Sequence, residues 1–127
     1  MPHITIECSR NVEKEIDLDA LVLHVHEAAI RTGVFPVDGI RSRLAILDHY
    51  RVGDAARNAF VHVTLRCAPG RDVEVKQRVV GDVFGELCAF LQPMYDAHPL
   101  AISLELGDLE ETRRNQNNLK SKSAAKI

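Results

Sequence analysis

Apolar and polar residues alternate along four stretches of the chain, a pattern typical of a β-strand with one buried face. In the first stretch, Ile4, Ile6 and Cys8 alternate with polar neighbours, so one side of the strand should be buried. The four stretches are residues 1–8, 40–47, 59–67 and 100–106. We therefore expect four short strands.

Two longer stretches have apolar residues at helical spacing instead. The first helix should begin after Asp17 as N-cap and end at Gly33. The second should open at Asp72 and end at Pro93, since proline lacks the N–H that continues a helix. The expected buried stripe of the first helix is Leu18, Leu21, Val22, Val25 and Ala29. The expected stripe of the second is Val73, Val80, Val83, Phe84, Leu87 and Leu91.

The predicted elements follow one another as strand, helix, strand, twice over. Residues 2–6 also resemble residues 59–63, which suggests an internal duplication within a single α+β domain over residues 1–127. The expected boundaries are 1–57 and 58–110 for the pseudo-repeats and 111–127 for a polar tail. A strand-helix-strand unit normally pairs its strands in parallel through a right-handed crossover. Both helices should then cover one face of a four-stranded sheet.

The other face of that sheet should carry no helix. Leu47 and Phe60 fall on it, together with His3 and His62. A closed homo-oligomer would cover this face without a second domain. The tail at 111–127 is too polar for a core, so we expect it either to fray or to lie across a neighbouring subunit.

Composition argues against several classes of protein. With 16 basic and 18 acidic residues the net charge is −2, which offers no basic surface for nucleic acid or a membrane. We find no apolar run near the ~20 residues of a spanning helix and no signal-peptide pattern, so we expect a cytoplasmic protein. Cys8, Cys67 and Cys88 lie far apart and the six histidines are scattered. We therefore expect neither a disulfide framework nor a metal site.

Pro2 stands directly behind the initiator methionine, at the start of the first predicted strand. If Met1 is removed, the new terminus is a secondary amine on a rigid ring, and this nitrogen is a base. Burial beside cations would lower its pKa towards neutrality, where a group can accept and return a proton. Pro2 alone is weak evidence of function, because proline is tolerated wherever a strand start needs no ladder hydrogen bond.

Three arginines strengthen the case for a site. Arg41 and Arg43 share one face of the second predicted strand, and Arg71 stands at the entrance to the second helix. Together with Pro2 they resemble the 5-carboxymethyl-2-hydroxymuconate isomerase family of the tautomerase superfamily. The resemblance covers essentially the whole chain, through Met1-Pro2-His3, Glu7-Cys8-Ser9, Thr32-Gly33-Val34-Phe35-Pro36, Gly39-Ile40-Arg41-Ser42-Arg43, Ala59-Phe60-Val61-His62-Val63-Thr64-Leu65 and Gln116-Asn117-Asn118.

This resemblance implies a homotrimeric keto-enol tautomerase of homoprotocatechuate (4-hydroxyphenylacetate) catabolism that needs no cofactor. The implied substrate is a carboxylated dienol, 5-carboxymethyl-2-hydroxymuconate, which the enzyme converts to its 2-oxo isomer. In the family, the terminal proline takes the 2-hydroxyl proton and delivers a proton to C5, while arginines hold the carboxylates. These roles fall on Pro2, Arg41 and Arg71, with Arg43 as a further candidate for substrate binding.

Elementary chemistry favours the same assignment. Arginine presents paired donors in a plane that matches a carboxylate and stays charged at any working pH. A guanidinium beside the 2-oxo group would stabilise a developing dienolate and lower the pKa of the Pro2 amine. The mechanism also requires the loss of Met1, because an acylated Pro2 has no basic lone pair.

The sequence leaves two other interpretations open. The chain could have another tautomerase-superfamily activity, such as that of a different 2-hydroxymuconate tautomerase or a dehalogenase, which would keep Pro2 but reshape the pocket. It could also be a non-catalytic trimer that binds a small molecule and keeps Met1. Mass spectrometry of the mature N-terminus would discriminate best between an enzyme and a binding module.

Overall fold

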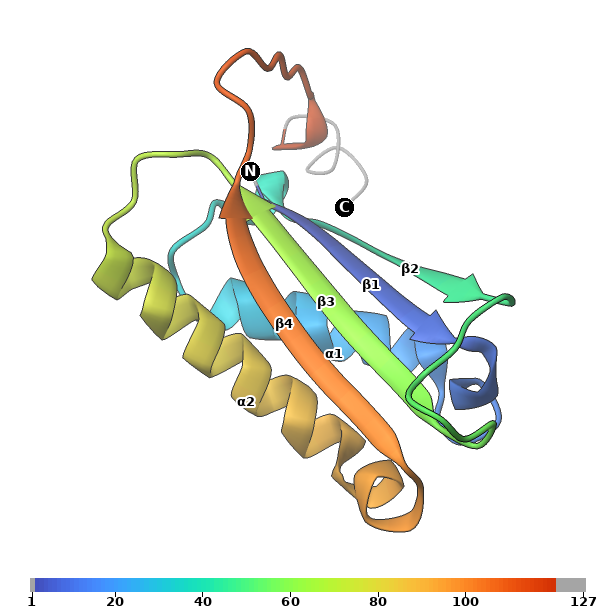
Figure 1. Cartoon of the computed structure of the whole chain (residues 1–127). Coiled ribbons are helices and arrows are strands. Elements are labelled where there is room, and N and C mark those ends of the chain that lie inside the picture. The colour runs from blue at the N-terminus through green and yellow to red at the C-terminus, as the bar shows by residue number, and fades with distance from the viewer. Residues whose placement is uncertain (1, 121–127) are drawn as a thin grey trace.

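The computed structural model describes residues 2–120, and its centre is a four-stranded sheet with two helices on one face (Figure 1). The strands are β1 (His3–Ser9), β2 (Arg41–Leu47), β3 (Ala59–Cys67) and β4 (Leu100–Asp108). The helices are α1 (Leu18–Arg31) and α2 (Val73–Ala97), with short 3-10 turns η1 (Arg10–Val12) and η2 (Val37–Gly39). The predicted α+β fold is confirmed. Met1 and the end of the predicted tail, residues 121–127, lie outside the described residues.

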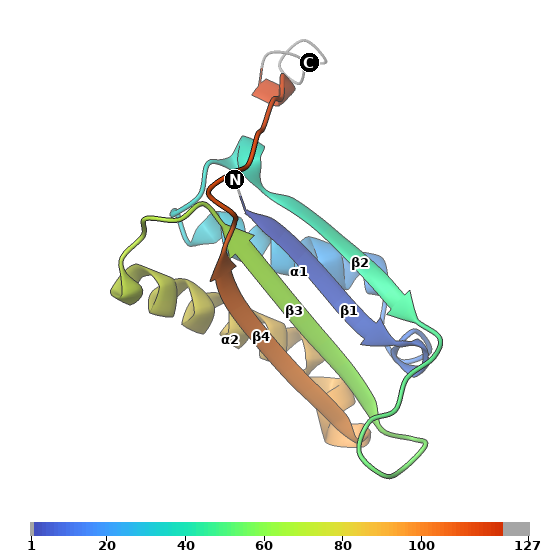
Figure 2. The same ribbon diagram turned by 45° about the horizontal axis from the view of Figure 1, so that its top comes forward.

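The strand order is β2-β1-β3-β4, with β1 parallel to β2, β3 parallel to β4, and β1 antiparallel to β3. His3 therefore lies between Arg41 on one side and Arg66 on the other. This register brings the starts of β1 and β2 to the same end of the sheet as the ends of β3 and β4 (Figure 2). Pro2 lies directly before β1 at this end of the sheet, which we call the Pro2 end.

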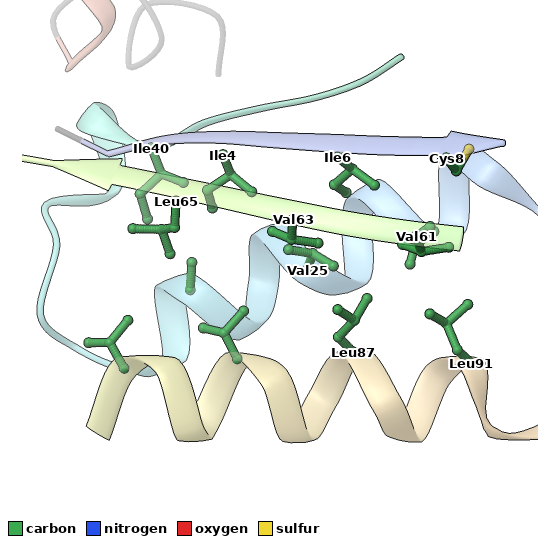
Figure 3. Packing of buried hydrophobic residues seen from close by; sticks show 14 of the residues in the cluster. Ile4, Ile6, Cys8, Val25, Ile40, Val61, Val63, Leu65, Leu87 and Leu91 are labelled. Carbon is green, nitrogen blue, oxygen red and sulfur yellow. The ribbon is translucent and has the colours of Figure 1, made fainter. Parts of the chain in front are cut away.

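The core lies between the sheet and the helices. Ile4 and Ile6 of β1 and Leu65 of β3 are fully buried on the helix side, as the alternation predicts. They face the two helices, from which Val25 and Leu87 point towards the sheet (Figure 3). Because the helices cover the sheet, one layer of aliphatic side chains holds both β-α-β units together.

The first helix begins as predicted. The Asp17 side chain caps it by accepting a hydrogen bond from the backbone N–H of Ala20 at 3.1 Å. Arg31 is its last residue, and Gly33 follows with a φ of 72°, a left-handed conformation that glycine adopts without strain. The chain then turns towards the Pro2 end.

The second helix begins directly after Asp72, as predicted, but its buried stripe and its end differ from the prediction. Val73 is 63% exposed, and Pro93 lies inside the helix, which continues to Ala97. Proline removes one backbone donor, but here Pro93 and Ala89, whose carbonyl loses that partner, are both exposed, so water can replace the bond. Buried side chains on either side of Pro93 keep the last turns packed on the sheet. The buried stripe is Val79, Val83, Leu87, Leu91 and Met94.

The open face of the sheet is more polar than the prediction implied. The side chains of β1 and β3 on this face are His3, Thr5, Glu7, Phe60, His62, Thr64 and Arg66. Most of them are half-buried even without a covering layer. Alternation has placed the aliphatic residues of both strands on the helix side, so this face does not need an apolar cover.

The described part of the tail leaves β4 at the Pro2 end. Leu109 still donates a backbone hydrogen bond to the Cys67 carbonyl at 2.8 Å, but residues 111–120 are exposed throughout. Figures 1 and 2 show this segment extending beyond the sheet. Within residues 2–120, no helix is long and apolar enough to span a membrane.

Candidate active site

Pro2 is buried at the end of the sheet, immediately before β1. Its carbonyl accepts a hydrogen bond from the backbone N–H of Arg41 at 3.1 Å, which ties Pro2 to the start of β2. The Arg41 side chain turns back along the chain, and its Nη1 donates to the Gly39 carbonyl at 3.3 Å. The backbone thus places Pro2 and Arg41 side by side.

Arg43 contacts His3 across the open face. The Nη1 of Arg43 donates to the Nδ1 of His3 at 2.8 Å, so the imidazole accepts at this nitrogen. Burial and the guanidinium groups of Arg43 and Arg41 lower the pKa of His3 below its ordinary value. His3 therefore stays neutral near pH 7 and adds no positive charge to this end of the sheet.

Arg71 reaches the Pro2 end from the connection between β3 and α2. Its Nη1 donates to the Ala68 carbonyl at 3.0 Å, and its Cζ lies 5.0 Å from the centre of the Phe35 ring. Phe35 is only 5% exposed and comes from the connection between α1 and β2. The guanidinium is thus held against an aromatic face rather than spread into solvent.

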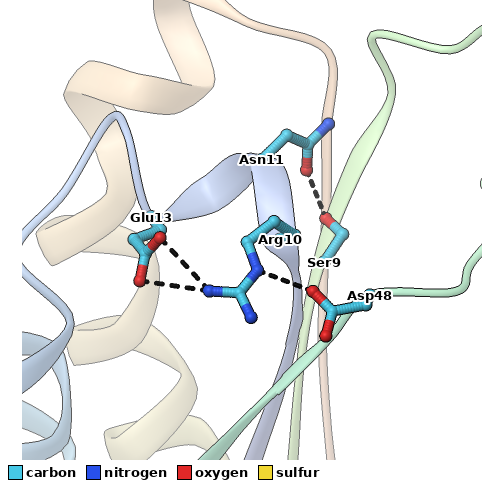
Figure 4. A network of polar contacts seen from close by, with 5 residues as sticks. All are labelled: Ser9, Arg10, Asn11, Glu13 and Asp48. Atoms are coloured by element: carbon cyan, nitrogen blue, oxygen red, sulfur yellow. Dashed lines mark hydrogen bonds and ion pairs between the residues drawn. The ribbon is translucent and has the colours of Figure 1, made fainter.

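Three arginines at this end of the sheet have no acidic partner among the described residues. Among residues 2–120, Arg43, Arg66 and Arg71 form no ion pair with a carboxylate and donate only to an imidazole or to carbonyls. At the opposite end of β1, Arg10 has two carboxylates around it, with its Nε 2.7 Å from Asp48 (Figure 4). Arginines without acidic partners leave donors for an anion, which suits a carboxylate ligand.

Within a single chain, Pro2 and the three arginines lie at one end of the sheet but not on one face of it. The register places Arg41 and Arg43 on the open face with His3, whereas Arg71 stacks on Phe35 of the core. A hollow of about 770 Å³ between α1 and β2 is lined in part by Arg43 but not by Pro2 or the other two arginines. That hollow is an open groove beside an edge strand, so we do not place the chemistry there.

A metal site and a cysteine acting as the base both have less support. Within the described part of the chain, no group of three or more His, Cys, Asp or Glu residues could hold a metal ion. Cys67 lies at the Pro2 end, but burial raises the pKa of its thiol above the ordinary value. A protonated, buried thiol is a poor base at neutral pH, so Cys67 does not compete with the Pro2 nitrogen as the candidate base.

Comparison with known proteins gives the family. The family model for 5-carboxymethyl-2-hydroxymuconate isomerase matches residues 2–123. The chain belongs to this family. The resemblance seen in the sequence is therefore confirmed over residues 2–123 of the chain.

The relatives of this isomerase-family protein match it over more than nine-tenths of their own lengths. A 5-carboxymethyl-2-hydroxymuconate Delta-isomerase from Escherichia coli is 35% identical over 121 residues, covering 94% of this chain and 96% of the relative. A crystal structure of a 5-carboxymethyl-2-hydroxymuconate isomerase from Deinococcus radiodurans R1 superimposes with a TM-score of 0.86 at 28% identity, covering 96% and 93%. A fused 4-OT, described as a symmetric trimer, shares the fold with a TM-score of 0.57 at 19% identity, covering 91% and 92%.

Sequence reasoning missed three features of this site. The acceptor role of His3 follows from its register opposite the arginines, which the alternation alone could have indicated. Arg66 lies beside His3 only because β1 and β3 are antiparallel, which the pattern of strands does not specify. Phe35 belongs to one of the segments that carry the resemblance, but the sequence indicated no role for it, because its contact with Arg71 joins the two halves of the chain.

Proposed function

We propose that this isomerase-family protein converts 5-carboxymethyl-2-hydroxymuconate to its 2-oxo isomer in the catabolism of aromatic compounds. Pro2, freed of Met1, is the acid and base of the reaction. Arg41 and Arg71 hold carboxylates of the substrate, and Arg43 is a further binding residue. The reaction moves one proton and changes no oxidation state, so it needs no cofactor.

The proton and the electrons balance within one substrate molecule. The Pro2 nitrogen takes the 2-hydroxyl proton, and the oxygen lone pair forms the 2-oxo double bond. The electrons of the two conjugated C=C bonds shift by one position, leaving a C3–C4 double bond and a carbanion-like C5. Pro2 then returns a proton to C5, which restores the free amine for the next turnover.

Electrostatics support this path. Negative charge develops on the 2-oxygen as its proton leaves, and a guanidinium stabilises that charge in place of water. The same positive charge disfavours a protonated Pro2, which keeps the amine free to accept a proton. The observation that carries the proposal is the position of Pro2, hydrogen-bonded to the start of β2, at an end of the sheet where Arg43 and Arg71 lack acidic partners.

The activity can be tested with two related dienols. We expect the protein beginning at Pro2 to remove the ultraviolet absorbance of 5-carboxymethyl-2-hydroxymuconate. It should act on 2-hydroxymuconate, which lacks the carboxymethyl arm, with a kcat/KM about 10- to 100-fold lower, because a charged hydrogen bond is lost. Equal or faster turnover of the shorter dienol would favour another tautomerase activity.

We also propose a closed trimer. The sheet has free edges at β2 and β4, and each is flanked by partly buried apolar side chains. Those of β4 are Leu100, Ile102, Leu104 and Leu106. Two different edges that pair head to tail close into a ring, and the fused 4-OT with this fold is a symmetric trimer.

Sedimentation equilibrium tests the assembly. We expect a trimer at low micromolar concentration, because free strand edges with apolar flanks associate readily. Backbone amides on the outer edges of β2 and β4 should exchange slowly in the trimer. A stable monomer at this concentration would contradict the proposal.

A further inference from the structure

The contact between Phe35 and Arg71 joins two connections that lie far apart in the chain. Phe35 belongs to the connection between α1 and β2, and Arg71 to that between β3 and α2. The Arg71 Cζ lies 5.0 Å from the Phe35 ring centre, within the range of a cation–π contact. Each of the two β-α-β units therefore supplies one partner at the Pro2 end.

Phe35 is a fixed platform. It is 5% exposed and belongs to the hydrophobic core, so its ring cannot turn away without opening a cavity. The preceding turn is also held, because the Thr32 side chain donates to the Ala29 carbonyl at 2.7 Å. From α2, Arg78 donates to the Thr32 carbonyl at 3.2 Å.

Arg71 depends on this platform for its orientation. The cation–π contact holds the guanidinium over the ring and uses none of its N–H donors in a hydrogen bond. One of these, Nη1, donates to the Ala68 carbonyl, and no carboxylate within residues 2–120 pairs with the others. Gly70, with a φ of 107°, places the preceding backbone in a conformation that other residues rarely adopt. The guanidinium is thus held in place by the Phe35 ring and the Ala68 carbonyl before any ligand arrives.

From these contacts we infer that Phe35 is a positioning residue that orients Arg71 to bind a substrate carboxylate. This inference rests on the proposed function of Arg71. A freely rotating arginine would lose side-chain entropy on binding, whereas one already stacked loses less. Loss of the contact with Phe35 should therefore lower kcat/KM, although no group that touches the substrate has been removed.

A double-mutant cycle measures the coupling. Phe35→Leu keeps apolar volume but removes the ring, and we expect kcat/KM to fall about 3- to 30-fold, the range of one lost cation–π contact. Phe35→Tyr keeps the ring and should retain near wild-type kcat/KM. In the Arg71→Ala background, Phe35→Leu should cause no further loss. A persistent full loss in that background would overturn the inference, since Phe35 would then act by another route.

Fluorination separates the electrostatic role from packing. Replacing Phe35 by trifluorophenylalanine preserves the shape of the ring but withdraws the negative charge from its face. We expect kcat/KM to fall with this residue as it does with leucine, at an unchanged melting temperature. Wild-type kcat/KM with the fluorinated ring would overturn the inference even if Phe35→Leu failed to fold.

Leu91→Ala and Arg71→Ala are controls that show whether a negative result contradicts the positioning role of Phe35 or the proposed function of Arg71. Leu91 is fully buried near the far end of α2, so Leu91→Ala should lower the melting temperature and leave kcat/KM unchanged. If Arg71→Ala is impaired but no Phe35 variant is, the positioning role is wrong and the proposed function stands. If Arg71→Ala itself has wild-type kinetics, the proposed function of Arg71 is wrong and the inference falls with it.

Discussion

Removal of Met1 should raise kcat/KM by about 10²–10⁴-fold, the usual contribution of a general acid or base. While Met1 is attached, the Pro2 nitrogen belongs to an amide and has no basic lone pair. An added residue on Pro2 would also stand between the nitrogen and the substrate. Processing therefore both creates the base and opens the site.

The cleanest measurement uses one preparation. Protein that retains Met1 is assayed for loss of the dienol absorbance, treated with a methionine aminopeptidase, and assayed again after mass spectrometry confirms the new terminus. Pro2→Ala should follow the same course but end at lower activity, because a primary amine is more flexible and less basic. Equal activity before and after processing would remove Pro2 from the mechanism.

The pH profile supplies a second test of the same amine. In the processed enzyme, kcat/KM should rise with pH through the pKa of Pro2, because only the unprotonated amine accepts a proton. The arginines stay charged throughout this range and should contribute no step. A profile without that rise would mean that some other group is the base.

Most of the fold was predictable because burial repeats at fixed intervals. Ile4, Ile6 and Cys8 are all fully buried, so alternation alone identified the covered face of β1. Parallel pairing followed from the strand-helix-strand order, and the register then set Arg41 beside His3. These features depend on local periodicity and chain connectivity, which a sequence contains directly.

Helix α2 shows where local rules fail. Pro93 should end a helix by its own propensity, yet Leu91 and Met94 on either side of it are buried against the sheet. Packing of these side chains outweighs one missing hydrogen bond on the exposed side. The prediction used the propensity of one residue, whereas the structure reflects the tertiary contacts of its neighbours.

The candidate site was predictable in its members but not in its arrangement. Pro2 and Arg41 lie at adjacent strand starts, so their proximity follows from the register. The contact between Arg71 and Phe35 instead depends on two loops whose glycines, Gly33 and Gly70, have positive φ. Loop conformations of this kind have no periodic signal in a sequence.

Replacement of the arginines should have the second large effect. Arg41→Ala and Arg71→Ala should each lower the rate about 10²–10³-fold if they stabilise developing charge, with the protein still folded. Arg71→Lys should recover part of the loss, because lysine keeps the charge but not the planar fork. Arg10→Ala is a matched control, since Arg10 pairs with Asp48 at the opposite end of β1 and should leave the kinetics unchanged.

Whether an arginine variant changes kcat or KM shows what that arginine does in the reaction. A fall in kcat marks an interaction made in the transition state, whereas a rise in KM alone marks equal binding of substrate and intermediate. Loss of a nearby guanidinium should also raise the pKa of the Pro2 amine, because a neighbouring positive charge no longer disfavours its protonation. The rising part of the pH profile should then move to higher pH in the variant that replaces the arginine nearest to Pro2. Wild-type kinetics and an unmoved profile in both variants would place Arg41 and Arg71 among ordinary surface charges.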